Sequence, residues 1–123
     1  MKLIAILISI LFLCSCKKTD DHQSDETFCY SFDVRGCETD QYSTYVLVSD
    51  SHAERESAMI DWLKDQNIQT IELNLEVQYH DAYCEACYVC TNGDRYFFTS
   101  DEPVTAQKAE DLELLNFKSE DCL

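Results

Sequence analysis

The stretch Ile71-Glu72-Leu73-Asn74-Leu75-Glu76-Val77-Gln78-Tyr79 alternates apolar and polar side chains without a break. Successive side chains of a β-strand point to opposite faces of the sheet, so this period of two predicts a strand with one face in the core and the other in water. Sheets of that kind are antiparallel or mixed, and they carry their helices on one side only. The stretch therefore predicts an α+β fold built of two layers.

The segment before this strand predicts a helix with a defined start and end. Ser51-His52-Ala53-Glu54 has the spacing of a capping box, in which the Ser51 hydroxyl accepts from the Glu54 amide and Glu54 reaches back. Asn67 suits the left-handed position that ends a helix. Between them, the side chains expected on the buried face follow helical spacing at Arg55, Met59, Trp62 and Leu63.

Two more strands are expected on the N-terminal side of this helix. Tyr45-Val46-Leu47-Val48 is continuously apolar and contains β-branched side chains, which predicts a central strand buried on both faces. Phe28, Tyr30 and Phe32 alternate with polar residues over a shorter stretch, which indicates an edge strand before it.

The C-terminal third predicts a hairpin, a second helix and a last strand. Asn92-Gly93 tolerates positive φ at both positions, so we expect a type I′ turn between strands at 88–91 and 95–99. Pro103 marks the start of the second helix, with Ser100 or Asp101 as its N-cap. The apolar face of that helix and the last strand are expected at Val104, Ala109 and Leu112, and at Leu114, Leu115 and Phe117.

Together these elements predict an α+β two-layer sandwich, with two helices on one face of a mixed or antiparallel sheet. The order of elements is similar to the ferredoxin-like βαββαβ plan. Residues 28–123 are long enough for one domain and too short for two. No repeat or internal linker divides this segment.

Cysteine usage predicts a fold braced by disulfides. Past the N-terminus, the cysteines are Cys29, Cys37, Cys84, Cys87, Cys90 and Cys122. An even number of cysteines in an exported chain indicates three disulfides, and the sequence leaves their pairing open. Because long loops gain most from a crosslink, we expect Cys122 to join the 84–90 segment and pin the C-terminus.

The first eighteen residues resemble the export signal of a bacterial lipoprotein of the signal peptidase II type. Lys2 is followed by an apolar stretch at 3–13, and Leu13-Cys14-Ser15-Cys16 resembles a lipobox. Such a stretch is too short to cross a bilayer. The resemblance implies a signal peptide at 1–15, acylation of Cys16, a flexible tether at 16–27, and an outer-membrane lipoprotein of a Gram-negative bacterium. The protein would lie at the periplasmic face or the cell surface, held by its lipid anchor.

The net charge of the chain indicates which class of partner its surface attracts and which it repels. The chain has 24 acidic residues against 9 basic ones, a formal net charge of −15. Such a surface repels nucleic acid and anionic lipid, and attracts a basic protein. Small acidic lipoproteins of this kind resemble immunity proteins that neutralise basic toxins. Solubility alone also explains an acidic surface, so the charge favours a basic protein partner without requiring one.

One dense cluster of cysteines suggests an alternative. His80, Cys84, Cys87 and Cys90 have spacings that metal ligands or a redox pair can use. An oxidising export route favours structural disulfides instead.

The sequence has no nucleophile elbow, P-loop, dinucleotide fingerprint or zinc-protease motif. We therefore expect no catalytic residue and no cofactor, and the oligomeric state stays open. The first hypothesis is a lipid-anchored protein-binding module without enzymatic activity, and the second is a thiol-redox or metal-binding lipoprotein.

Overall fold

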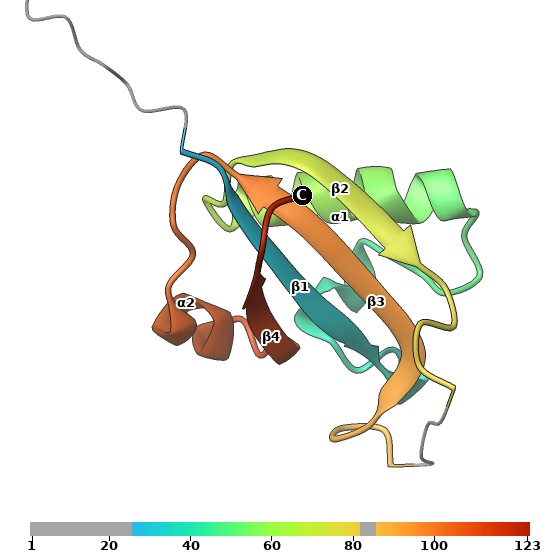
Figure 1. Ribbon diagram of the computed structural model, residues 1–123. Coiled ribbons are helices and arrows are strands. Elements are labelled where there is room, and N and C mark those ends of the chain that lie inside the picture. Colours follow the sequence, from blue (N-terminus) through green and yellow to red (C-terminus); the bar gives the residue numbers. More distant parts are fainter. Residues whose placement is uncertain (1–25, 82–85) are drawn as a thin grey trace, which may run out of the picture.

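The computed structural model describes residues 26–81 and 86–123, and its strands and α-helices follow one another in the order βαββαβ (Figure 1). They are β1 (Phe28–Arg35), the 3₁₀ turns η1 (Gly36–Glu38) and η2 (Gln41–Thr44), α1 (His52–Asp65), β2 (Thr70–Glu76), β3 (Thr91–Ser100), α2 (Ala106–Asp111) and β4 (Leu115–Glu120). The four strands form one sheet in the order β2-β3-β1-β4, and every neighbouring pair is antiparallel. This is the ferredoxin-like arrangement, so the predicted α+β class is confirmed.

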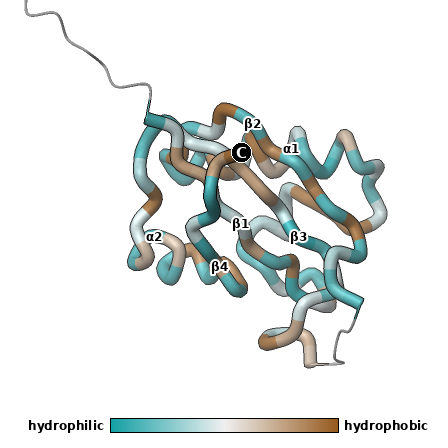
Figure 2. The backbone as a smooth tube through the Cα atoms, in the orientation of Figure 1, coloured by the Kyte–Doolittle hydropathy of each residue, from teal (hydrophilic) through white to brown (hydrophobic). Residues whose placement is uncertain are grey.

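The core lies between the sheet and the helices. Tyr30 and Phe32 of β1 are opposite Phe98 and Tyr96 of β3, and all four are buried against α1, η2 and α2. Figure 1 shows α1 behind the sheet, and Figure 2 shows that the stretch leading to the C-terminus on the other side is hydrophilic. The two faces of the sheet therefore differ in what covers them.

The first helix has the predicted boundaries. Ser51 is the N-cap of α1, and both hydrogen bonds of the capping box with Glu54 are present. The buried residues of α1 are the four predicted ones, Arg55, Met59, Trp62 and Leu63. Asn67 adopts a φ of 60°, and the Ile68 amide donates to the Leu63 carbonyl at 2.9 Å. The positive φ of Asn67 and this hydrogen bond end the helix as predicted.

Of the two strands predicted on the N-terminal side, the one at 45–48 is absent and the one that begins at Phe28 is central to the sheet. The stretch 45–48 is a loop, and only Val46 in it is buried. Its backbone groups are satisfied locally, since the Val46 amide donates to the Tyr42 carbonyl and the Leu47 amide to the Asp50 carboxylate. The central position belongs to β1, which the sequence analysis placed at an edge, because β1 pairs with β3 on one side and β4 on the other.

The alternating stretch forms a strand, but a shorter one than predicted. β2 ends at Glu76, and Gln78 adopts a φ of 57° that turns the chain. A register shift between Thr70 and Glu72 interrupts the alternation, so Leu75 is buried while Ile71 is 55 % exposed. β2 pairs only with β3 and is an edge strand of the sheet.

The hairpin at Asn92-Gly93 does not form, because both residues lie inside β3. Gly93 uses its φ of 101° there within the strand, where the Asn92 side chain accepts from the Asp94 amide at 2.9 Å. The strands that pair with β3 come from distant parts of the chain, β1 and β2. Positive φ at a glycine serves an irregularity in a strand as well as a turn, and the sequence alone does not separate the two.

The predicted N-cap of the second helix was also wrong. Ser100 is the buried last residue of β3, and α2 begins later, with Thr105 as its N-cap. The Thr105 hydroxyl accepts from the Lys108 amide at 3.1 Å. The predicted apolar face is present in part: Ala109 of α2 and Leu112 at its C-cap are buried, whereas Val104 precedes the helix and is partly buried. The last strand is present as β4, at 115–120.

Candidate functional site

The face of the sheet opposite the core carries a cluster of polar side chains that the sequence analysis missed. Ser31 and Asp33 alternate with the core residues of β1, so they point to this open face. Arg95 of β3 lies directly opposite Asp33 and shares the face. Asp33 is 0 % exposed and Arg95 is 2 % exposed, although no described helix lies over them.

Asp33 is the centre of this cluster. Its carboxylate accepts from Arg95 Nη1 at 2.5 Å and from Asn116 Nδ2 at 2.7 Å, and the Nε2 atom of His80 lies 3.0 Å away. Asn116 has a φ of 51° at an irregular step in the pairing of β4 with β1. Such a bulge redirects a side chain, and asparagine tolerates the left-handed conformation better than most residues. The bulge thus brings the Asn116 amide onto Asp33.

The cluster continues toward the C-terminus through Ser31. Arg95 Nη2 donates to the Ser31 hydroxyl at 2.5 Å, and that hydroxyl donates to the Glu120 carboxylate. The hydrogen bond from Ser31, with a smaller contribution from Arg95, holds the pKa of the Glu120 carboxyl below its usual value. Glu120 therefore stays ionised at neutral pH.

The loop after β2 supplies the aromatic part of the open face. The Gln78 amide donates to the Asp94 carboxylate and the His80 amide to the Gly93 carbonyl, both at 3.0 Å, and these bonds fix the loop on β3. The Arg95 guanidinium then lies 5.4 Å from the ring centre of Tyr79 and 5.8 Å from that of Phe97. These distances are in the range of cation–π contacts.

A groove of about 910 Å³ crosses the open face near the C-terminal end of β3. Ile71, Glu72 and Asn74 of β2 line one side, and the last residues of the chain line the other. Phe97 and Thr99 of β3 lie between these walls. The groove therefore joins an apolar surface to polar walls, which is the usual composition of a binding cleft.

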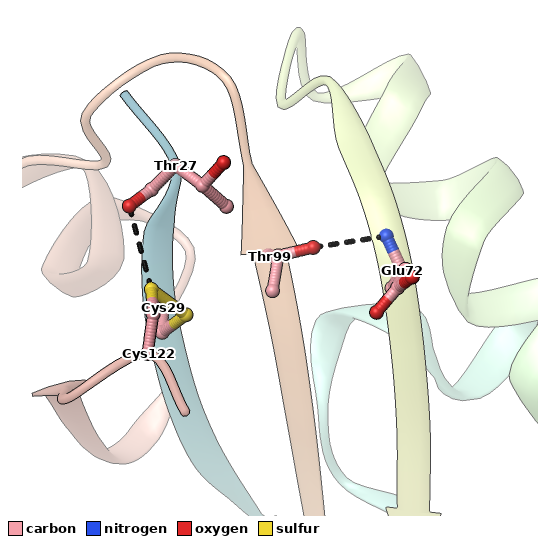
Figure 3. Close-up of a disulfide and its surroundings, with 5 residues drawn as sticks. All are labelled: Thr27, Cys29, Glu72, Thr99 and Cys122. Atoms are coloured by element: carbon pink, nitrogen blue, oxygen red, sulfur yellow. Dashed lines mark hydrogen bonds between the residues drawn. A yellow bond between two sulfur atoms is a disulfide. The ribbon is translucent and has the colours of Figure 1, made fainter. Parts of the chain in front are cut away.

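A disulfide forms the second wall of this groove. Cys29 at the start of β1 is bonded to Cys122, and their Cα atoms are 5.4 Å apart (Figure 3). The Cys122 sulfur also lies 3.3 Å from the Thr27 carbonyl oxygen. The bond holds the C-terminal residues against β1 and beside the groove.

The groove is rimmed by negative charge. Glu72 and Asp121 are exposed, and within residues 26–81 and 86–123 neither carboxylate takes part in an ion pair. Glu120 adds a third carboxylate. Arg95, a buried cation of the face, pairs with Asp33 at 2.5 Å and with Glu120 at 3.5 Å, so Glu72 and Asp121 are the rim carboxylates it leaves unpaired. This rim attracts cationic groups and repels a polyanion such as nucleic acid.

Wherever the structure describes them, the cysteines predicted to form disulfides are disulfide-bonded. Cys37 of η1 is bonded to Cys87, across 50 residues of sequence, and Cys90 is disulfide-bonded as well. Cys84 lies outside the described residues. The expectation that Cys122 joins the 84–90 segment was wrong, because Cys122 pairs with Cys29. Antiparallel pairing of β4 with β1 puts the two ends of the domain side by side, which sequence spacing did not reveal.

The alternative metal or redox site was expected at His80, Cys84, Cys87 and Cys90. In the oxidised state described here, Cys87 and Cys90 offer no thiolate, and His80 contacts the Asp33 carboxylate. In the part of the chain that the structure describes, no group of three or more His, Cys, Asp or Glu side chains is arranged to hold a metal ion. A metal site at these cysteines therefore requires their disulfides to be reduced first.

The predicted signal peptide at 1–15, the acylation site Cys16 and most of the tether at 16–27 lie outside the described residues. Among the described elements, neither helix has the length and apolar character that a membrane span needs. Thr27, the end of the predicted tether, borders the groove.

Comparisons of the chain with protein-family models, with curated proteins and with solved structures found no match.

Proposed function

We propose that the protein is a lipid-anchored envelope lipoprotein, without enzymatic activity, that binds a basic protein through the open face of its sheet. The observation that carries the proposal is the groove on that face, where the exposed carboxylates of Glu72 and Asp121 rim an apolar surface. Apolar area supplies binding energy, and the charges select and steer a cationic partner.

The charge of the whole chain supports the same class of partner. A formal net charge of −15 disfavours association with nucleic acid or anionic lipid. A basic protein meets an attractive field from the net charge and the exposed carboxylates of Glu72 and Asp121 at the groove. Immunity-like neutralisation of a basic toxin is one function of this kind.

The lipid anchor is supported by the N-terminal sequence, with Cys16 as the modified residue and the outer membrane as the destination. Mass analysis of the protein isolated from envelopes tests it. We expect a mature chain that begins at Cys16 and carries acyl chains, and a Cys16→Ser variant that leaves the membrane fraction. An unmodified cysteine would refute the anchor.

Site-specific crosslinking tests the binding proposal. A photoreactive amino acid replaces Asn74, which is exposed at the groove, or Asp61, which is exposed on α1 on the other side of the sheet. We expect a crosslinked protein from position 74 and none from position 61. The purified partner should bind less tightly as NaCl rises from about 50 mM to about 500 mM, because salt screens exposed charges.

Equal crosslinking from both positions, or affinity that does not change with salt, would refute recognition of a basic partner by this face.

A further inference from the structure

We infer that the groove holds an extended peptide segment of the partner in which lysine or arginine side chains flank an aliphatic one. This inference rests on the proposed function and specifies the chemistry of the bound segment. It follows from the apolar surface of the groove, from the charges on its two walls, and from the state of the β2 edge.

The apolar surface of the groove favours an aliphatic side chain in the bound peptide segment. Ile71 is 55 % exposed on one wall, and Phe97 is partly exposed between the walls. An exposed aliphatic side chain beside an aromatic ring gains free energy when an apolar group of a ligand covers both.

The carboxylates on the two walls of the groove favour cationic side chains on both sides of the aliphatic one. Glu72 stands on the β2 wall, and Asp121 stands on the wall that the Cys29–Cys122 disulfide fixes. A segment lying between the walls meets a carboxylate on each side. In an extended peptide, alternate side chains point to one face and the residue between them points to the other. The aliphatic residue can therefore face the sheet while the long, flexible lysine or arginine side chains before and after it bend toward the carboxylates of the walls.

The β2 edge favours binding in the groove over addition of a new strand. Partners that add a strand rely on free backbone groups at the sheet edge. Here the Leu75 amide already donates to the Glu56 carboxylate of α1 at 2.8 Å, whereas the Glu72 amide points inward to the Thr99 hydroxyl of β3 at 3.1 Å (Figure 3). A side chain of the protein thus uses a backbone donor that an added strand would need, so we expect side-chain contacts to hold the bound segment.

A synthetic peptide of alternating lysine and leucine tests the inference. Its binding to the purified full chain in neutral detergent is followed by fluorescence anisotropy, beside a peptide of alternating glutamate and leucine. We expect the lysine peptide alone to bind. Glu72→Lys should weaken its binding at least about fivefold, as expected for reversing one exposed charge. Ile71→Ser should weaken binding by a similar factor through lost apolar contact.

Matched variants separate local from general effects. Asp61→Lys makes the same change in net charge on the other side of the sheet, and Val77→Ser removes an aliphatic side chain that is 50 % exposed but does not line the groove. We expect both controls to change the affinity less than about twofold, since neither touches the bound segment.

The outcomes distinguish this inference from the proposed function. If the lysine peptide binds and all four variants lower its affinity equally, the groove is not the site, while an acidic surface for a basic partner stands. If the lysine peptide fails to bind up to about 1 mM, or the glutamate peptide binds as well, the segment chemistry is wrong. The crosslinking experiment at position 74 then still decides whether the open face binds a protein.

Discussion

Replacing Asp33 with alanine should lower the free energy of unfolding by about 3 kcal/mol. The carboxylate is fully buried and has three side-chain partners, Arg95 at 2.5 Å, Asn116 at 2.7 Å and His80 at 3.0 Å. Three hydrogen bonds at about 1 kcal/mol each give this figure. Loss of one partner of a buried ion pair costs about 3–5 kcal/mol. We expect the lower end, because Glu120 remains 3.5 Å from the stranded Arg95 guanidinium.

Urea unfolding of the protein with its disulfides intact measures the effect. With a slope of about 1.5 kcal/mol per molar urea, the midpoint should fall by about 2 M. The control is Asp61→Ala, an exposed carboxylate on α1, which should change stability by less than about 0.5 kcal/mol. Adding Arg95→Met to Asp33→Ala should restore part of the loss, because the unpaired buried cation is then gone.

A cost below about 1 kcal/mol for Asp33→Ala would refute the view that the cluster stabilises the open face. So would a double variant whose loss is the full sum of the two single losses, because the two charges would then not interact.

Three further changes have expected outcomes. Ser51→Ala should cost about 1 kcal/mol in thermal unfolding, because α1 loses its N-cap. Burial raises the pKa of Tyr96 from 10.0 to about 12. The contribution of the protonated tyrosine to the free energy of unfolding is therefore complete below pH 10 and is lost as pH rises toward 12. Tyr96→Phe should reduce this alkaline loss of stability, measured as urea midpoints over a series of pH values. Replacing Cys29 and Cys122 together with serine should cost about 2–5 kcal/mol in urea unfolding, since the bond spans 93 residues of sequence, and should weaken lysine–leucine peptide binding because one groove wall is released.

Features that depend on neighbouring residues were predictable. The capping box at Ser51 and Glu54, the buried face of α1 and the end of that helix at Asn67 involve groups within a few positions of each other. Their geometry is decided by the chain itself, so the sequence pattern is sufficient.

Features that depend on distant pairing were predicted wrongly. Asn92-Gly93 is compatible with a turn and with a strand irregularity, and β3 lies there because β1 and β2 pair with it. The loop at 45–48 has strand composition, but its backbone bonds are made locally and it does not join the sheet. In both places local preference allowed two conformations and the sheet selected one.

The candidate site could not be predicted from the sequence for the same reason. Asp33, Arg95 and Asn116 are separated widely in sequence, and each alone looks like an ordinary polar residue of a strand. The alternation of Ser31 and Asp33 with aromatic residues was the available signal, since polar side chains on a central strand must find partners. Their partners could not be named before the strand order was known.

The sequence by itself determined the α+β class, the first helix with its caps, the acidic charge and the presence of disulfides. Only the tertiary structure decided the order β2-β3-β1-β4, the pairing of Cys29 with Cys122 and the groove beside that bond. Composition and local spacing act through neighbouring residues, whereas strand order and disulfide pairing depend on which distant segments meet when the core closes. The surface proposed to bind a partner consists of such segments and exists only in the folded chain.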